Sequence, residues 1–227
     1  MNGVGAGGAG AGGAVNDAQA AAGGMPGIAG RGLDGVPDRV TSAEELRALV
    51  GEPHESVVKK SIAMIDEHIR NYLAMSPLFF LSTSGADGTC DVSPRGGGPG
   101  FVRVLDDRRL LYPEKPGNRR ADSMLNILSN PHVGMLFMIP GQNEVLRING
   151  KAAITRNREL LEPLAADGGT PPPLGVVVEV EECFVHCPRA LQFAGIWNTA
   201  GWPAKEKLPS IREMFLAHIR INGLTLE

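Results

Sequence analysis

The chain has 227 residues, of which 43% are hydrophobic and 21% are charged, and its formal net charge is -3. A chain of this size and composition can bury a sizeable core as one soluble domain. The near-neutral charge gives no electrostatic reason to expect nucleic acid or an anionic membrane as a partner. No segment approaches the ~20 consecutive apolar residues of a membrane span.

The first 35 residues differ in composition from the rest of the chain, because they are dominated by glycine and alanine. Glycine-rich chain loses much conformational entropy on ordering and has little apolar surface to bury. We therefore predict a flexible tail over residues 1–35, with a tether or an arm on a partner subunit as the alternative. Residues 36–227 are predicted to form a single domain with helices at both of its ends.

The three cysteines, Cys90, Cys183 and Cys187, have no spacing typical of a disulfide framework. The tail also lacks the charged start and Leu-rich stretch of a signal peptide. These features predict a cytoplasmic protein with reduced thiols. Cys183 and Cys187 flank His186 closely, but no second ligand pair accompanies them, so we predict buried, apolar-like cysteines and no metal site.

Helical signals dominate the region before residue 77. Ser42 and Glu45 form a capping box, which predicts a short helix ending at about Val50. A longer helix is predicted over Glu55–Met75, ended by Pro77. Its apolar residues at helical spacing are Val58, Ile62, Ile65, Ile69 and Leu73.

Short apolar runs separated by turn sequences predict strands over most of the remaining chain. The predicted strands are Leu78–Ser82, Cys90–Ser93, Phe101–Leu105, Leu110–Tyr112, Val133–Ile139 and Glu144–Thr155, with one or two more over Gly175–Val180 and Cys183–His186.

Helices are predicted between and after these strands, and the GGTPPP sequence at 168–173 is predicted to be a loop. The predicted helices are Arg119–Leu128, Asn157–Pro163, Arg189–Ala194 and Ile211–Ile221. Six or seven strands in hairpins, without regular alternation of strand and long helix, predict a mainly β fold. We expect a closed antiparallel barrel with peripheral helices.

Two adjacent arginines follow a helix-capping residue type at Asn118. We expect Asn118 to cap the predicted helix and Arg119 and Arg120 to lie in its first turn, where the helix dipole already favours anions. Two cations beside the positive end of the helix dipole repel it unless an anion is bound between them. This arrangement therefore indicates a phosphate site. The alternative is that both arginines face water or pair with Asp122 or Glu114.

A glycine-rich run, SPRGGGPG at residues 93–100, would let a flat ligand approach the backbone closely. It is neither a Walker loop nor a dinucleotide fingerprint, because no Gly-Lys-Ser/Thr and no helix follows it. We expect Ser93 and Arg95 to reach a ligand phosphate or ring edge. The alternative is an ordinary surface loop.

Alternation along 146–152 places Arg147, Asn149 and Lys151 on one strand face, which either faces solvent or lines a site at a subunit interface. Trp197 is either a core residue, which we favour, or an aromatic wall for a stacked ring. No residue is assigned a catalytic role, since no hydrolase constellation is recognisable.

The chain resembles the pyridoxamine 5'-phosphate oxidase-like, FMN-binding split-barrel family from about Val40 to Leu216. The resemblance rests on five motifs in the same order, namely DVSPRG (91–96), PGFV (99–102), LYPEKPGNRR (111–120), SNPHVGMLF (129–137) and RINGKA (147–152). It implies a split barrel of six or seven antiparallel strands and a homodimer with FMN bound at the subunit interface.

The resemblance also implies which residues bind the cofactor. Two segments match oxidase motifs that hold the FMN phosphate and ribityl chain. Tyr112 and Pro113 take the place of the oxidase's Tyr-Thr strand end, and Gly117 to Arg120 take the place of its Gly-Ser-Arg-Lys turn. The implied cofactor residues are Ser93, Pro94, Arg95, Gly96, Tyr112, Asn118, Arg119, Arg120, Arg147 and Asn149. The oxidase's C-terminal Trp and Arg substrate motifs have no counterpart near Trp197 and Trp202.

From this resemblance we expect an FMN-dependent oxidoreductase in which NADH or NADPH reduces a small aromatic or nitroaromatic molecule. The cofactor supplies the hydride chemistry, and the protein orients it. The alternatives are a flavin or haem store or sensor without turnover, an enzyme using a deazaflavin, and an oxidase of the pyridoxamine 5'-phosphate type.

Overall fold

The computed structural model describes residues 33–115, 117–165 and 169–224. Most of the predicted Gly/Ala tail therefore lies outside the described residues. The chain divides into two compact units, Met1–His54 and Glu55–Glu227. The first contains a short 3-10 helix, Leu33–Gly35, and α1 (Ala43–Val50). Ser42 caps α1 as predicted, because its hydroxyl accepts a hydrogen bond from the Glu45 N–H at 3.1 Å.

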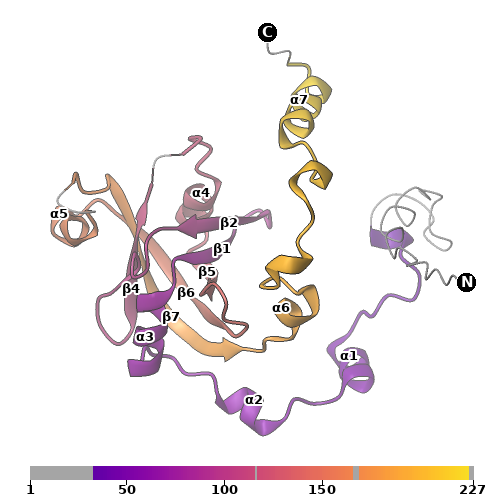
Figure 1. Ribbon diagram of the computed structural model, residues 1–227. Coiled ribbons are helices and arrows are strands. Elements are labelled where there is room, and N and C mark those ends of the chain that lie inside the picture. Colours follow the sequence, from indigo (N-terminus) through magenta and orange to yellow (C-terminus); the bar gives the residue numbers. More distant parts are fainter. Residues whose placement is uncertain (1–32, 116, 166–168, 225–227) are drawn as a thin grey trace, which may run out of the picture. The chain divides into compact units, whose positions relative to one another are not determined.

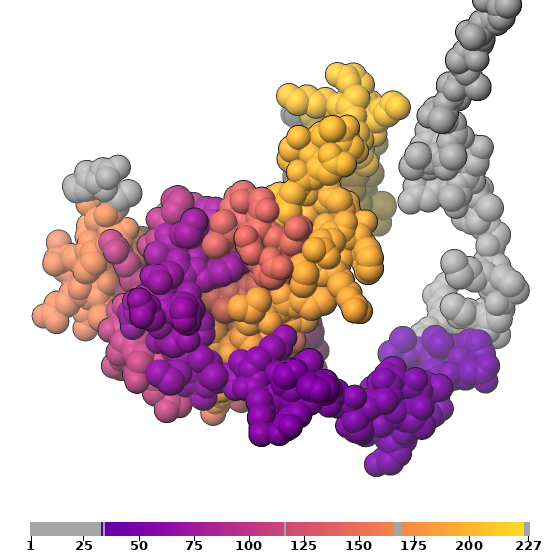
Figure 2. Space-filling view, turned by 60° about the horizontal axis from the view of Figure 1, so that its bottom comes forward, coloured from indigo at the N-terminus to yellow at the C-terminus, as the bar shows by residue number. Residues whose placement is uncertain are grey.

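In the second unit, the predicted helix Glu55–Met75 is wrong, because the chain forms two helices, α2 (Glu55–Lys59) and α3 (Glu67–Met75). Between them Ile62 forms a β-bridge with Cys183, with N–O distances of 3.0 and 2.7 Å in the two directions. Figure 2 shows this purple segment against the orange residues of β7 (Leu174–His186). The apolar spacing reflects burial of Ile65, Ile69 and Leu73, but a backbone bond to a distant strand overrides the local helical pattern.

Seven antiparallel strands form one sheet with the order β2-β1-β5-β6-β7-β4-β3 (Figure 1). The strands other than β7 are β1 (Leu78–Ser84), β2 (Cys90–Gly96), β3 (Arg103–Val104), β4 (Arg109–Glu114), β5 (His132–Met138) and β6 (Val145–Thr155). This is the antiparallel split-barrel architecture expected from the resemblance. The closed barrel expected from the strand pattern is wrong, because β2 and β3 are sheet edges with no backbone pairing between them in the described residues.

Two strand boundaries matter for the site. β2 continues to Gly96, so Pro94, Arg95 and Gly96 belong to a strand and not to the predicted glycine-rich loop. β7 is one continuous strand of 13 residues. β7 pairs antiparallel with β6, and the pairing register shifts between Asn149 and Gly150. At this shift a Cβ on Gly150 would collide with the carbonyl oxygen of Glu179.

The predicted helix Arg119–Leu128 is shorter than expected, since α4 runs from Asp122 to Ser129. Ala121 occupies its N-cap position with a left-handed backbone (φ 57°) and provides no side-chain cap. Arg119 is also left-handed (φ 65°). The chain thus turns sharply before α4, which packs against β1, β2 and β6.

The remaining helices follow β6 and β7. They are α5 (Arg158–Leu161), α6 (Arg189–Ala194), α7 (Ile211–Ile221) and the 3-10 helices Glu162–Leu164, Thr199–Gly201 and Lys205–Lys207. None of the described helices is long and apolar enough to cross a membrane.

An aromatic cluster lies at the centre of the core. The ring of Phe79 packs against three others, with centroid distances of 5.7 Å to Phe101, 5.0 Å to Tyr112 and 4.8 Å to Phe137. Phe79, Tyr112 and Phe137 are fully buried. Since Phe101 also lines the pocket described below, this cluster connects the core to the candidate site.

The prediction of buried cysteines is correct for one residue of the pair Cys183 and Cys187. Cys183 is fully buried in the core, and this burial raises the pKa of its thiol to about 12. Cys187 is an exposed free thiol, so the expectation of burial is wrong for it, and Cys90 is exposed as well. Each lies at or just beyond a strand end, where alternation no longer keeps a side chain in the core.

Candidate functional site

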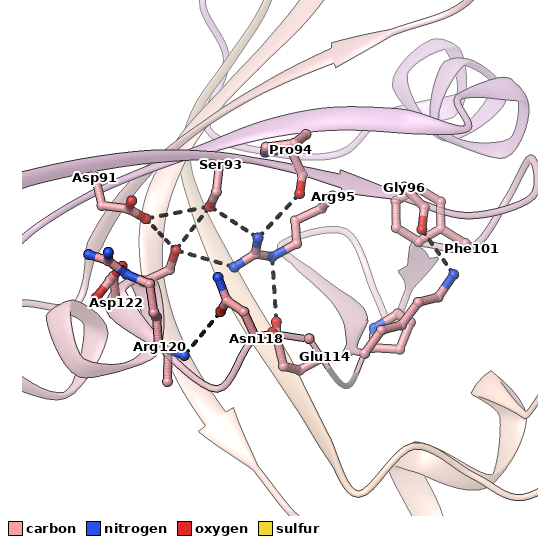
Figure 3. Close-up of a pocket in the computed structure, with 15 residues that line it drawn as sticks. Asp91, Ser93, Pro94, Arg95, Gly96, Phe101, Glu114, Asn118, Arg120 and Asp122 are labelled. Atoms are coloured by element: carbon pink, nitrogen blue, oxygen red, sulfur yellow. Dashed lines mark hydrogen bonds and ion pairs between the residues drawn. The ribbon is translucent and has the colours of Figure 1, made fainter. Parts of the chain in front are cut away.

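A pocket of about 550 Å³ lies where β2, the end of β4 and the start of α4 meet (Figure 3). Its lining combines charged groups, hydroxyls and an aromatic ring. The lining residues are Asp91, Ser93, Pro94, Arg95, Gly96, Phe101, Pro113, Glu114, Lys115, Gly117, Asn118, Arg120, Ala121, Asp122 and Ser123. The volume lies within the roughly 300–1,000 Å³ typical of small-molecule and cofactor pockets.

Strand alternation supplies one side of this pocket. Asp91, Ser93 and Arg95 are half-buried on the same face of β2, whereas the intervening residues are exposed. Ser93 and Arg95 lie opposite the core residues Leu81 and Phe79 of β1 in the sheet register. The period of two thus places a carboxylate, a hydroxyl and a guanidinium group side by side.

These groups and Ser123 of α4 form a hydrogen-bonded network (Figure 3). The Arg95 guanidinium donates to the Ser93 hydroxyl at 3.0 Å and to the Ser123 hydroxyl at 3.2 Å. Both hydroxyls donate in turn to Oδ2 of Asp91, Ser123 at 2.6 Å and Ser93 at 3.4 Å. The network fixes the Arg95 head group at the pocket wall.

An ion pair joins the two strands that border the pocket. Nε of Arg95 on β2 lies 3.4 Å from Oε2 of Glu114 at the end of β4, and their side chains are only 20% and 25% exposed. Neither of these two buried atoms has a hydrogen bond within the described residues. Nearby, Nζ of Lys115 donates to the carbonyl of Gly96 at 3.0 Å. Side chains therefore bridge β2 and β4, which share no backbone pairing.

The turn before α4 supplies the opposite wall. Oδ1 of Asn118 accepts a hydrogen bond from the N–H of Arg120 at 3.0 Å, so Asn118 orders the turn instead of capping α4 as predicted. Nε of Arg120 donates to Asp122 at 2.8 Å, and this bond raises the pKa of the guanidinium group. Because α4 begins at Asp122, the expectation of both arginines in its first turn is wrong. Arg119 is exposed and does not line the pocket.

The pocket lining is balanced in charge at neutral pH. Three cations, Arg95, Lys115 and Arg120, face three carboxylates. The carboxylates are Asp91, Glu114 and Asp122. The pairing of Arg120 with Asp122 also matches the alternative stated for this turn, in which the arginines pair with neighbouring acids.

Tyr112 lies behind this wall and does not line the pocket. Its ring is fully buried beside Phe79, and its hydroxyl has no hydrogen bond within the described residues. Burial is the main cause that raises the pKa of this phenol, and the Glu114 carboxylate raises it further while Arg95 opposes the shift. A buried hydroxyl without a partner carries an uncompensated desolvation cost.

We expect Tyr112→Phe to leave the free energy of unfolding unchanged or to raise it by up to about 1 kcal/mol, because the substitution removes a buried, unbonded hydroxyl. Urea unfolding would measure the change. Tyr72→Phe is the matched control. Its hydroxyl donates to the carbonyls of Glu144 at 3.0 Å and Phe137 at 3.3 Å, so that variant should lose about 1 kcal/mol. A comparable loss in Tyr112→Phe would contradict the prediction.

Arg147 and Asn149 lie on β6, away from this pocket. The guanidinium of Arg147 stands over the ring of Phe184, 5.5 Å from its centroid. Nδ2 of Asn149 donates to Glu182 at 2.6 Å. Within the chain these two residues thus lie apart from Ser93, Arg95 and Arg120.

Trp197 is half-buried and is not part of the core, so the favoured core assignment is wrong. Its indole N–H donates to the carbonyl of Gln142 at 2.9 Å, which fixes the ring at the surface. It does not line the pocket either. No group of three or more His, Cys, Asp or Glu side chains within the described ranges is placed to hold a metal ion.

Several pocket residues were not identified from the sequence as cofactor ligands. Asp91 lies in a motif examined only for other residues, and Ser123 lies within the predicted helix Arg119–Leu128. Glu114 and Lys115 follow the Tyr-Pro strand end. The alternation of Asp91, Ser93 and Arg95 would have indicated Asp91. No local pattern indicates Ser123, because its role depends on packing of α4 against β2.

Comparison with known proteins identifies a family but no curated relative. The family model described as pyridoxamine 5'-phosphate oxidase matches residues 65–187. No curated protein matches the chain.

Solved structures resemble part of the chain at low identity. HupZ of Group A Streptococcus is 21% identical, with 54% of this chain and 94% of that chain covered and a TM-score of 0.44. A Lactobacillus delbrueckii protein assigned as a pyridoxamine 5'-phosphate oxidase is 24% identical (54% and 95% covered, TM-score 0.43). An FMN-binding protein of Syntrophomonas wolfei is 11% identical (63% and 93% covered, TM-score 0.40).

The family match spans more than half of the chain and contains all seven strands between its limits, from β1 to β7. It also contains the pocket and every residue that lines it. The chain therefore belongs to the pyridoxamine 5'-phosphate oxidase family.

Proposed function

We propose that this protein is an FMN-dependent oxidoreductase of the cytoplasm, in which NADH or NADPH is the electron donor for reduction of a small aromatic or nitroaromatic molecule. The observation that carries the proposal is the convergence of Arg95, Lys115 and Arg120 with two serine hydroxyls in one pocket. The family implied by the sequence motifs uses FMN, whose phosphate requires such donors.

The residues present fit the phosphate end of FMN. Arg95 and Arg120 supply guanidinium groups, Lys115 supplies an ammonium group, and Asn118 orders the turn between them. The first N–H groups of α4 have no side-chain cap, and a helix N-terminus of this kind favours an anion. The turn before the helix is tight, with left-handed backbone at Arg119 and Ala121.

The rest of the pocket suits the flat ring of the cofactor. Phe101, Pro94 and Gly96 form a less polar border, and the exposed Gly96, which has no side chain, lets a ring approach the backbone. Bound FMN would supply hydride transfer between the nicotinamide and the acceptor. The protein's own groups would anchor the phosphate, orient the ring and limit access of water.

A homodimer would complete the site at the subunit interface. Arg147 and Asn149 lie on the face of β6 that points away from the core, where they neighbour Leu136 and Gly134 of β5 in the register. In the proposed dimer they belong to the cofactor site of the partner subunit. This arrangement accounts for their separation from Arg95 in one protomer.

Absorption spectroscopy of the purified protein tests the proposal. We expect flavin bands after reconstitution with FMN and their loss on anaerobic addition of NADH or NADPH. Nitroaromatics, quinones and pyridoxamine 5'-phosphate would then be assayed as substrates. Bound FMN that neither nicotinamide reduces would indicate a binding or sensor protein. A Soret band would indicate haem in place of FMN, and a deazaflavin spectrum would indicate a deazaflavin.

A further inference from the structure

Glu114 occupies an unusual position for a residue in a phosphate pocket. Its carboxylate lies against Arg95, and Oε2 is buried without a hydrogen bond in the described residues. The other two guanidinium nitrogens of Arg95 already donate, Nη1 to Ser93 and the Pro94 carbonyl and Nη2 to Ser123. Nη2 keeps one further N–H, whereas Nε donates to nothing within the described residues, and Glu114 stands in front of it (Figure 3).

We infer that Glu114 is an internal competitor for the cofactor phosphate and thereby determines how strongly, and how selectively, the pocket binds phosphorylated flavin. This inference rests on the proposed function, because it assumes that Arg95 contacts the FMN phosphate. When the phosphate enters, the Glu114 carboxylate gives up its place at Nε. The residue acts on specificity, and it takes no part in hydride transfer.

The charge balance of the pocket supports this role. With Glu114 ionised, three carboxylates cancel three cations around the pocket, so a phosphate dianion gains no net long-range attraction. Without the Glu114 charge the lining carries one net positive charge. Because the Arg95 and Glu114 side chains are only 20% and 25% exposed, water and salt screen this charge less than they would screen a surface charge.

Glu114 has a second, structural role that predicts the opposite effect. The ion pair joins β2 to β4 across a gap without backbone pairing, so its removal would loosen the pocket. If this role dominates, loss of the carboxylate weakens FMN binding. If competition dominates, loss of the carboxylate strengthens it, and the sign of the change separates the two.

The test is titration of wild-type protein and Glu114→Gln with FMN and with riboflavin, which carries the same ring without the phosphate. We expect Glu114→Gln to bind FMN about tenfold more tightly, with riboflavin affinity unchanged. Glu162→Gln is the matched control. It removes one carboxylate that pairs with Arg158 at 3.1 Å outside the pocket, and its FMN affinity should equal that of the wild type.

Unchanged or weaker FMN binding by Glu114→Gln would overturn the inference, as would an equal gain for riboflavin. If Glu114→Gln does not fold by circular dichroism, Glu114→Asp replaces it, because one methylene fewer withdraws the charge from Arg95. A gain of about threefold is then expected, and no gain overturns the inference. Failure of the wild type to bind either flavin would instead refute the proposed function.

Discussion

The double substitution Arg95→Ala with Arg120→Ala is expected to weaken FMN binding by about 100-fold or more, since each guanidinium contributes roughly 1.5–3 kcal/mol through charge-assisted hydrogen bonds. Both side chains line the pocket from opposite walls, Arg95 on β2 and Arg120 before α4. Riboflavin affinity should fall much less, because riboflavin has no phosphate. Fluorescence titration of both flavins measures the difference.

Arg119→Ala is the matched control for this experiment. Arg119 is adjacent to Arg120 in the sequence but is exposed and does not line the pocket. Its FMN affinity should stay within about threefold of the wild type, since a screened surface charge contributes little. If Arg119→Ala weakened FMN binding as much as the double variant, the assignment of the phosphate to Arg95 and Arg120 would be wrong.

The turn before α4 illustrates how far local sequence can predict this site. Asn118 and the two arginines indicated a charged helix start, because residue types at helix starts follow from backbone chemistry. The helix begins later, at Asp122, so Asn118 is not its cap and both arginines precede it. The sequence could not indicate which arginine faces the pocket. The backbone there is left-handed at Arg119 and Ala121, a conformation that residues other than glycine adopt uncommonly and that this sequence does not signal.

The pairing of Glu114 with Arg95 illustrates what local sequence cannot predict. The two residues lie on β2 and β4, which occupy separate parts of the sheet order. Their contact joins two strands that share no backbone pairing in the described residues, and no periodicity encodes it. A polar strand face likewise does not say which site it lines, and Arg147 and Asn149, chosen from such a face, do not line this pocket.

The strands predicted from short apolar runs correspond to observed strands, whereas one helix prediction failed where a distant backbone bond intervened. The predicted strand Leu78–Ser82 lies within β1, in which Phe79, Leu81 and Thr83 are buried with the period of two typical of a strand. The predicted helix Glu55–Met75 failed because Ile62 pairs with Cys183 far along the chain. Helical spacing of apolar residues indicates which side chains are buried, but it does not require one continuous helix. Two short helices with an extended segment between them can bury the same side chains.

The aromatic cluster under the pocket leads to the second prediction of large effect. We expect Phe79→Ala to lower the free energy of unfolding by about 3–5 kcal/mol, because it removes a fully buried ring and leaves a cavity. Such a loss is a large fraction of the roughly 5–15 kcal/mol that stabilises a typical domain. The three neighbouring rings, at 4.8 to 5.7 Å, would lose their shared partner.

Urea unfolding at equilibrium measures this loss, with Phe193→Ala as the control. Phe193 is 85% exposed, so the same substitution there should change the free energy of unfolding by no more than about 0.5 kcal/mol. A loss below about 1 kcal/mol in Phe79→Ala would contradict the central position of the cluster. Because Phe79 stacks on Phe101, which borders the pocket, the variant should also bind riboflavin more weakly. Weaker riboflavin binding would indicate that the aromatic core supports the part of the proposed site that binds the flavin ring. The effect would not depend on the arginines proposed to bind the phosphate.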